Sequence, residues 1–183
     1  MKRARFLILL VLAFLAVFAQ AAWAGPRVWL GSPINLVPPL VVYAALRLSL
    51  AGVSGLAVVA GLWLDALSAN PLGVSILPLF LVGLALWQQR DLLLRELDYA
   101  QVLLGAAASA VVPVLTLGLV FGKGLHPDVG WDSLWQLVVL AVTGGVLTPL
   151  VFRLMDRLET AFLHPPAPAL PFRTDRDLKR GRY

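Results

Sequence analysis

Long hydrophobic runs separated by short polar connections dominate the chain. A helix needs about 20 apolar residues to cross the hydrocarbon core of a membrane, where its backbone must satisfy its own hydrogen bonds. The pattern therefore predicts an all-α membrane protein with about six transmembrane helices in a compact bundle, within one domain over residues 1–163. The predicted spans are 6–24, 33–46, 51–67, 71–87, 102–121 and 134–152.

Charged and apolar residues are mixed in the stretch 88–101, between the fourth and fifth runs. Asp91 and Arg95 are spaced i,i+4 with the acid first, the better order for a helical pair, and leucines alternate with these charges. This pattern predicts a separate amphipathic helix at the membrane surface that presents Arg90 and Arg95. The last helix is expected to continue past the membrane through Arg153 and Arg157.

Prolines occur within several hydrophobic runs or at their starts. Pro38 and Pro39 remove two backbone donors and predict a kink in the second helix, and Pro149 predicts a break in the sixth. Pro71 follows Ser68 and Asn70, a pattern typical of the first residue of a helix. The tail 164–183 is rich in proline and basic residues, and polyproline geometry is expected at its start.

The chain begins with a basic leader. The first hydrophobic run follows it and ends in an A-x-A type sequence at Ala24. A cleaved signal peptide is therefore one interpretation. The run of nineteen residues from 6 to 24 is longer than the usual core of such a peptide, which favours retention as the first span.

Composition agrees with the membrane prediction: 60% of the 183 residues are hydrophobic and 14% are charged, against about 25% charged in soluble domains. Cysteine is absent, which excludes disulfides. With six spans and a cytoplasmic N-terminus, thirteen Lys and Arg residues lie on the inner side and two, Arg27 and Lys123, on the outer side. The positive-inside rule therefore puts both termini in the cytoplasm and attributes the net charge of +5 to orientation and anionic lipid, with no nucleic-acid partner.

Asp65 is the only side chain charged at neutral pH within a hydrophobic run. An acid at such a position is a candidate functional site. Three interpretations are open: hydrogen bonding to the turn that follows it, through Ser68 or Asn70 or as a cap near Pro71; contact with a partner; and transport. The topology places this acid near the outer face. Three glycines around it are expected to be packing positions, namely Gly61, Gly73 and Gly83.

Catalytic chemistry finds little support in the sequence. Gly52, Ser54 and Gly55 match the G-x-S-G form of intramembrane serine proteases, but such a serine needs a histidine base, and both histidines lie outside the hydrophobic runs. The pattern predicts no catalytic residue, no metal site and no cofactor. The polar side chains of the runs are scattered along the sequence and predict no polar lining for a transported substrate; they are Gln20, Thr116, Gln136, Thr143 and Thr148.

The order of these features resembles the rod shape-determining protein MreD family, small polytopic proteins of the bacterial inner membrane. The Gly61-x-x-x-Asp65 pattern followed by Pro71-Leu-Gly73 carries the resemblance. It is accompanied by hydrophobic matches at 40–46 and 81–83, and it spans about 34–158. The tail has no counterpart in the family pattern.

The resemblance implies a non-enzymatic scaffold of the cell-elongation machinery that supports rod shape and lateral peptidoglycan synthesis. Its partners would be an MreC-like protein and, through it, MreB, RodA and the transpeptidase of RodA. The family's fold is also similar to that of the substrate-binding subunits of energy-coupling-factor vitamin transporters, so such a subunit is the alternative. The first run lacks the A-x-x-x-A spacing of those subunits, because Val17, Gln20 and Trp23 follow Ala13, Ala16 and Ala19 by four residues.

Overall fold

The prediction of an all-helical bundle is confirmed by the computed structural model, which describes residues 2–23, 25, 29, 31–68, 71–93, 97–123 and 130–163. The tail 164–183 lies outside the described residues. Within them the chain forms six helices, one for each predicted run: α1 (Lys2–Ala22), α3 (Val37–Arg47), α4 (Leu50–Ala66), α5 (Ile76–Leu93), α6 (Leu97–Gly122) and α7 (Trp131–Leu163).

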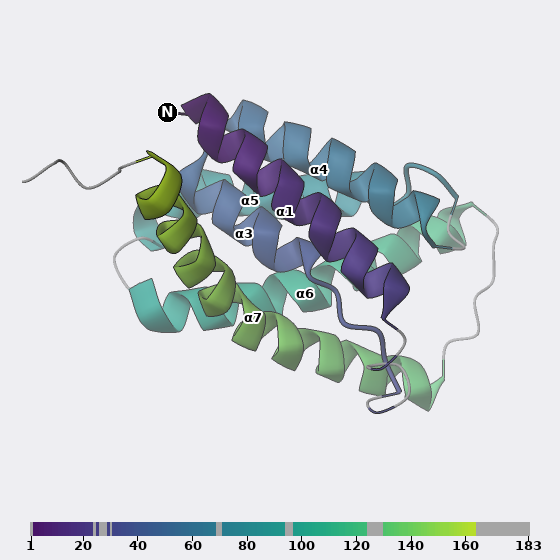
Figure 1. The fold of residues 1–183 in the computed structure, drawn as a ribbon. Coiled ribbons are helices and arrows are strands. Elements are labelled where there is room, and N and C mark those ends of the chain that lie inside the picture. The colour runs from purple at the N-terminus through teal and green to yellow at the C-terminus, as the bar shows by residue number, and fades with distance from the viewer. Residues whose placement is uncertain are drawn as a thin grey trace, which may run out of the picture.

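Helix α3 is the centre of the bundle, and α1, α4, α5, α6 and α7 all pack against it (Figure 1). All ten residues from Val37 to Leu46 are buried. At 1.5 Å per residue, the helix is about 16 Å long, roughly half the thickness of a hydrocarbon core.

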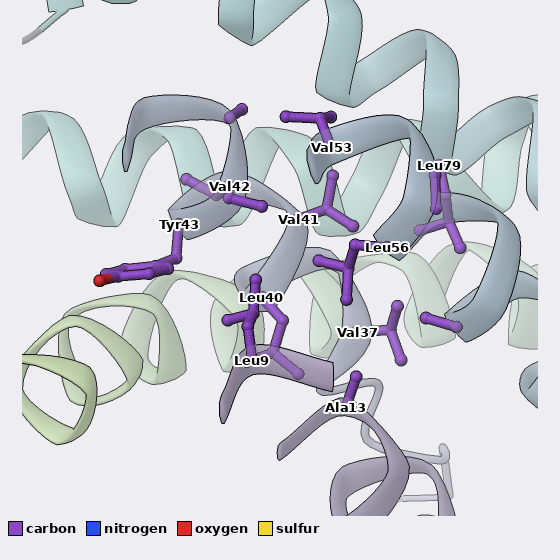
Figure 2. Close-up of a cluster of buried hydrophobic side chains, with 14 of the residues drawn as sticks. Leu9, Ala13, Val37, Leu40, Val41, Val42, Tyr43, Val53, Leu56 and Leu79 are labelled. Atoms are coloured by element: carbon purple, nitrogen blue, oxygen red, sulfur yellow. The ribbon is translucent and has the colours of Figure 1, made fainter. Parts of the chain in front are cut away.

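Helix α1 is part of the same core (Figure 2). Leu9, Ala13 and Val17 repeat every four residues, so they share one helix face, and at most 2% of each is exposed. Phe14 adds an edge-to-face contact with Trp63 of α4, with ring centroids 5.2 Å apart. Helix α1 therefore packs as a structural member of the bundle.

Helices α6 and α7 approach each other so closely that their backbones are in contact. A Cβ atom at Gly105 would lie 2.6 Å from the carbonyl oxygen of Gly144, and one at Gly144 would lie 2.8 Å from the carbonyl oxygen of Gly105. Only glycine leaves room for this crossing, as in other close helix pairs of membrane proteins. Buried Ser109 and Thr148 flank the contact.

The predicted effects of the prolines are wrong in two helices. Helix α3 begins at Val37, so Pro38 and Pro39 lie in its first turn, where their missing N–H groups have no intrahelical partner to lose. The Oδ1 atom of Asn35 accepts the N–H of Val37, the first residue of the helix, at 3.1 Å. In α7, the helix continues through Pro149 without a break.

The separate surface helix predicted over 88–101 is also wrong. Helix α5 continues to Leu93 and α6 starts at Leu97, so most of the stretch belongs to the ends of two longer helices. No glycine or proline occurs from 84 to 104. Because helix-breaking residues are absent there, the neighbouring helices extend into the stretch from both sides. Residues 94–96 lie outside the described residues. The predicted extension of the last helix past Arg153 and Arg157 is confirmed, because α7 ends at Leu163.

Three helices in the described part of the chain are long and apolar enough to cross a membrane: Ala4–Ala22, Tyr99–Gly122 and Trp131–Ala161. Helices α3 and α4 are shorter but apolar. The faces of α1, α6 and α7 that point away from the core carry exposed leucine, valine and phenylalanine side chains. These features identify a multi-pass membrane protein.

Polar contacts tie three helix ends together at one end of the bundle, called here the Glu159 end. Glu159 of α7 forms an ion pair with Arg5 of α1 at 2.9 Å. Its other carboxylate oxygen accepts the hydroxyl of Tyr43 of α3 at 2.8 Å. The start of α1 and the ends of α3 and α7 therefore meet, as the alternating spans require (Figure 1).

This packing predicts that α1 remains in the mature protein. Its removal would expose the buried face of α3 and leave Glu159 without Arg5. The protein is purified by a C-terminal tag and its intact mass is measured. That mass is expected to include residues 2–22. A mature N-terminus at Gly25 would contradict this assignment.

Candidate functional site

Asp65 lies in the last turn of α4, and its side chain is 2% exposed. Its Oδ2 atom accepts the backbone N–H groups of Gly73 at 2.8 Å and Ser75 at 3.1 Å. Bonds from amides to a carboxylate are charge-assisted and stronger than neutral ones. They also offset the unfavourable position of an anion at the C-terminal end of a helix, where the helix dipole is negative. The carboxylate therefore joins α4 to the turn before α5.

Two glycines of the motif make this connection possible. A Cβ atom at Gly61 would lie 2.9 Å from the Cα of Ile76, so α4 touches the backbone of the first residue of α5. The expectation that Gly73 is a packing position is wrong: it has a φ of +91° with nothing near its missing side chain, so its role is conformational. Gly61, Asp65 and Gly73 together define what we call the Asp65 corner.

The predicted helix start at Pro71 is wrong. Residues 71–75 form a turn, with the N–H of Val74 bonded to the carbonyl of Pro71 at 3.3 Å, and α5 begins at Ile76. The positive φ at Gly73 and its bond to Asp65 hold the backbone out of the helix. Ser68 donates its hydroxyl to the main-chain carbonyl of Asp65 at 3.4 Å, whereas Asn70 lies outside the described residues.

The other glycine in the predicted set, Gly83, lies on α5 away from the corner. A Cβ atom there would lie 2.6 Å from Val53 of α4 and 3.1 Å from Val41 of α3. It is a contact point of three helices. The serine of the protease-like motif, Ser54, donates its hydroxyl to the carbonyl of Leu50 within its own helix at 2.9 Å.

A cavity of ≈ 370 Å³ opens beside the Asp65 corner. Ser68 and Ser75 connect the two features, because both line the cavity and both belong to the corner's hydrogen bonds. The other walls come from α1, α4, α6 and α7 and from the segment that precedes α3. The polar residues in the lining are Gln20, Asn35, Ser68, Ser75, Thr116 and Gln136.

The inference that the polar side chains are scattered is wrong for three of the five. Gln20, Thr116 and Gln136 come from three helices and line the same cavity. Thr143 and Thr148 instead donate to backbone carbonyls of α7. The alternating direction of the predicted spans could have indicated this convergence. All three lining residues lie toward the predicted outer ends of their runs.

The arginines predicted to form a cytoplasmic surface are only partly described. Arg153 and Arg157 are exposed one helical turn apart on α7, and they lie toward the Glu159 end. The guanidinium carbon of Arg90 lies 4.9 Å from the ring centroid of Trp87, within range of a cation–π contact. Arg95 lies outside the described residues.

Comparisons of the chain with protein-family models, with curated proteins and with solved structures found no match.

The corner predicts a large effect of the Asp65→Ala substitution. It leaves the N–H groups of Gly73 and Ser75 without their acceptor, and an unsatisfied buried group costs about 1–3 kcal/mol. Unfolding of the purified protein in detergent micelles should show a loss of stability of at least this size. Asp132→Ala, which removes an exposed acid from the first turn of α7, is the matched control. Equal unfolding midpoints for the two variants would contradict the assignment.

Proposed function

We propose that this chain is a non-enzymatic scaffold of the MreD type in the bacterial cytoplasmic membrane, with both termini in the cytoplasm. In this proposal it supports the cell-elongation machinery, and therefore rod shape and lateral peptidoglycan synthesis. Its direct partner is an MreC-like protein, which connects it to MreB, RodA and the RodA transpeptidase.

The observation that carries the proposal is the use of the shared motif within the fold. Gly61 permits a close approach, Asp65 accepts two amides and Gly73 supplies a positive φ. The residues by which the chain resembles MreD are thus the ones that fix the α4–α5 connection. A resemblance based on such residues points to a shared fold, and the acid in the motif has a structural role.

The exposed surfaces suit a protein that works by contact. The outward face of α1 is apolar along its length and carries Leu7, Val11, Phe14, Leu15 and Phe18. It can pack against lipid or against the membrane helix of a partner. At the Glu159 end, exposed Arg153 and Arg157 on α7 offer positive charge to cytoplasmic proteins or anionic headgroups.

Co-purification tests the proposal. The tagged protein, extracted from membranes with a mild detergent, is expected to bring down an MreC-like protein and RodA. Recovery of transporter ATPases without cell-wall proteins would contradict the proposal and favour the alternative, a substrate-binding subunit of an energy-coupling-factor transporter.

Charge variants sharpen the same experiment. Arg153→Glu combined with Arg157→Glu is expected to reduce recovery of cytoplasmic partners such as MreB. Arg153→Lys combined with Arg157→Lys keeps the charge and serves as the matched control. Equal recovery of MreB with the Glu and the Lys double variants would show that Arg153 and Arg157 do not take part in the proposed contact.

A further inference from the structure

The cavity beside the Asp65 corner has the size of a small-molecule site. Its volume of ≈ 370 Å³ falls within the range of roughly 300–1,000 Å³ that is usual for ligand pockets. Its walls come from α1, α4, α6 and α7 and from the segments that precede α3 and α5. A ligand held there would contact parts of the chain that are far apart in sequence.

One buried side-chain atom in the described lining lacks a hydrogen-bond partner. The Nε2 atom of Gln20 is buried and has none among the described residues. Gln20 also lines a second cavity of ≈ 140 Å³, which shares Pro33 and Ile34 with the first. A buried amide without a partner is costly, and native structures nearly always supply one. Because Gln20 lines both cavities, its side-chain amide is placed to hydrogen-bond a group held there.

The chemistry of the lining selects the class of ligand. The described polar residues of the larger cavity carry only amide and hydroxyl groups, and both kinds can donate and accept hydrogen bonds. An anionic ligand is disfavoured, because the buried carboxylate of Asp65 is close to the cavity. It accepts the backbone N–H of Ser75, and Ser75 lines the cavity. Valine and leucine side chains form most of the remaining wall, and Trp23 in the smaller cavity adds an aromatic face with an N–H donor.

We propose that the cavity binds an uncharged, hydroxyl-rich group of the sugar type, with Gln20 and Thr116 as hydrogen-bonding residues. The group is either a free sugar or the headgroup of a glycolipid whose chains lie in the membrane. Thr116 donates its own hydroxyl to the carbonyl of Val112 at 2.9 Å, so its oxygen remains an acceptor for a sugar hydroxyl. The inference does not depend on the proposed scaffold role.

Binding measurements on the full-length protein in phosphatidylcholine nanodiscs test the site. The probes are radiolabelled glucose, monoglucosyl diacylglycerol and, as a charged comparison, phosphatidylglycerol. Gln20→Leu and Thr116→Val each remove hydrogen-bonding capacity with little change in size. Each is expected to weaken sugar binding about three- to tenfold, the effect of one neutral hydrogen bond.

Two controls match the substitutions. Gln88→Leu makes the same change at an exposed site on α5, and Thr143→Val does so on α7, where the hydroxyl also donates to the carbonyl four residues earlier. Both are expected to bind as the wild type does. Binding of free glucose identifies a soluble ligand, whereas binding of the glycolipid alone identifies a membrane lipid.

Three results would overturn the proposal. The first is that the wild-type protein binds neither sugar probe above empty nanodiscs, as a cavity filled with water would. The second is that Gln20→Leu and Thr116→Val bind as tightly as their controls. The third is that phosphatidylglycerol binds as tightly as the glycolipid and depends on Gln20 in the same way.

Discussion

The carboxylate of Asp65 and the two amides that it accepts are the interaction on which the bundle depends. They bring the turn 71–75 back onto the end of α4, and the direction of α5 follows from that. Because α5 also packs on α3 and α6, an error at this corner would spread to the centre of the fold. An acid is suited to the task because a single Oδ2 atom accepts both N–H groups, and a charged acceptor forms stronger hydrogen bonds than a neutral one.

The position of α3 shows what the corner supports. A helix of eleven residues, buried on every side, cannot define a span by itself and depends on its neighbours for its place. Two devices hold those neighbours close: the glycine contact between α6 and α7, and the Arg5–Glu159–Tyr43 contacts that join α1, α3 and α7. The Asp65 corner and the Glu159 contacts lie at opposite ends of the bundle, so both ends of the packed helices are fixed.

Much of this fold could be predicted from hydrophobic runs, because lipid permits few structures and each run became one helix. The errors concern local backbone geometry. Pro71 carries a helix-start pattern, but a carboxylate six residues earlier holds the turn open, and Pro38 and Pro39 are harmless because α3 starts one residue before them. Gln20, Thr116 and Gln136 are more than a hundred residues apart at their extremes, so only the packed bundle brings them to one cavity. The importance of Asp65 was visible in the sequence, whereas the identity of its two donors was not.

The most direct measurement of the central claim is hydrogen exchange at the amides of Gly73 and Ser75, resolved by NMR on the protein in micelles or nanodiscs. If the Asp65 carboxylate holds the corner, both amides exchange slowly in the wild type and much faster in Asp65→Ala, while the amide of Val74, bonded to Pro71, changes less. Exchange of both amides at the rate of a free turn in the wild-type protein would contradict the account.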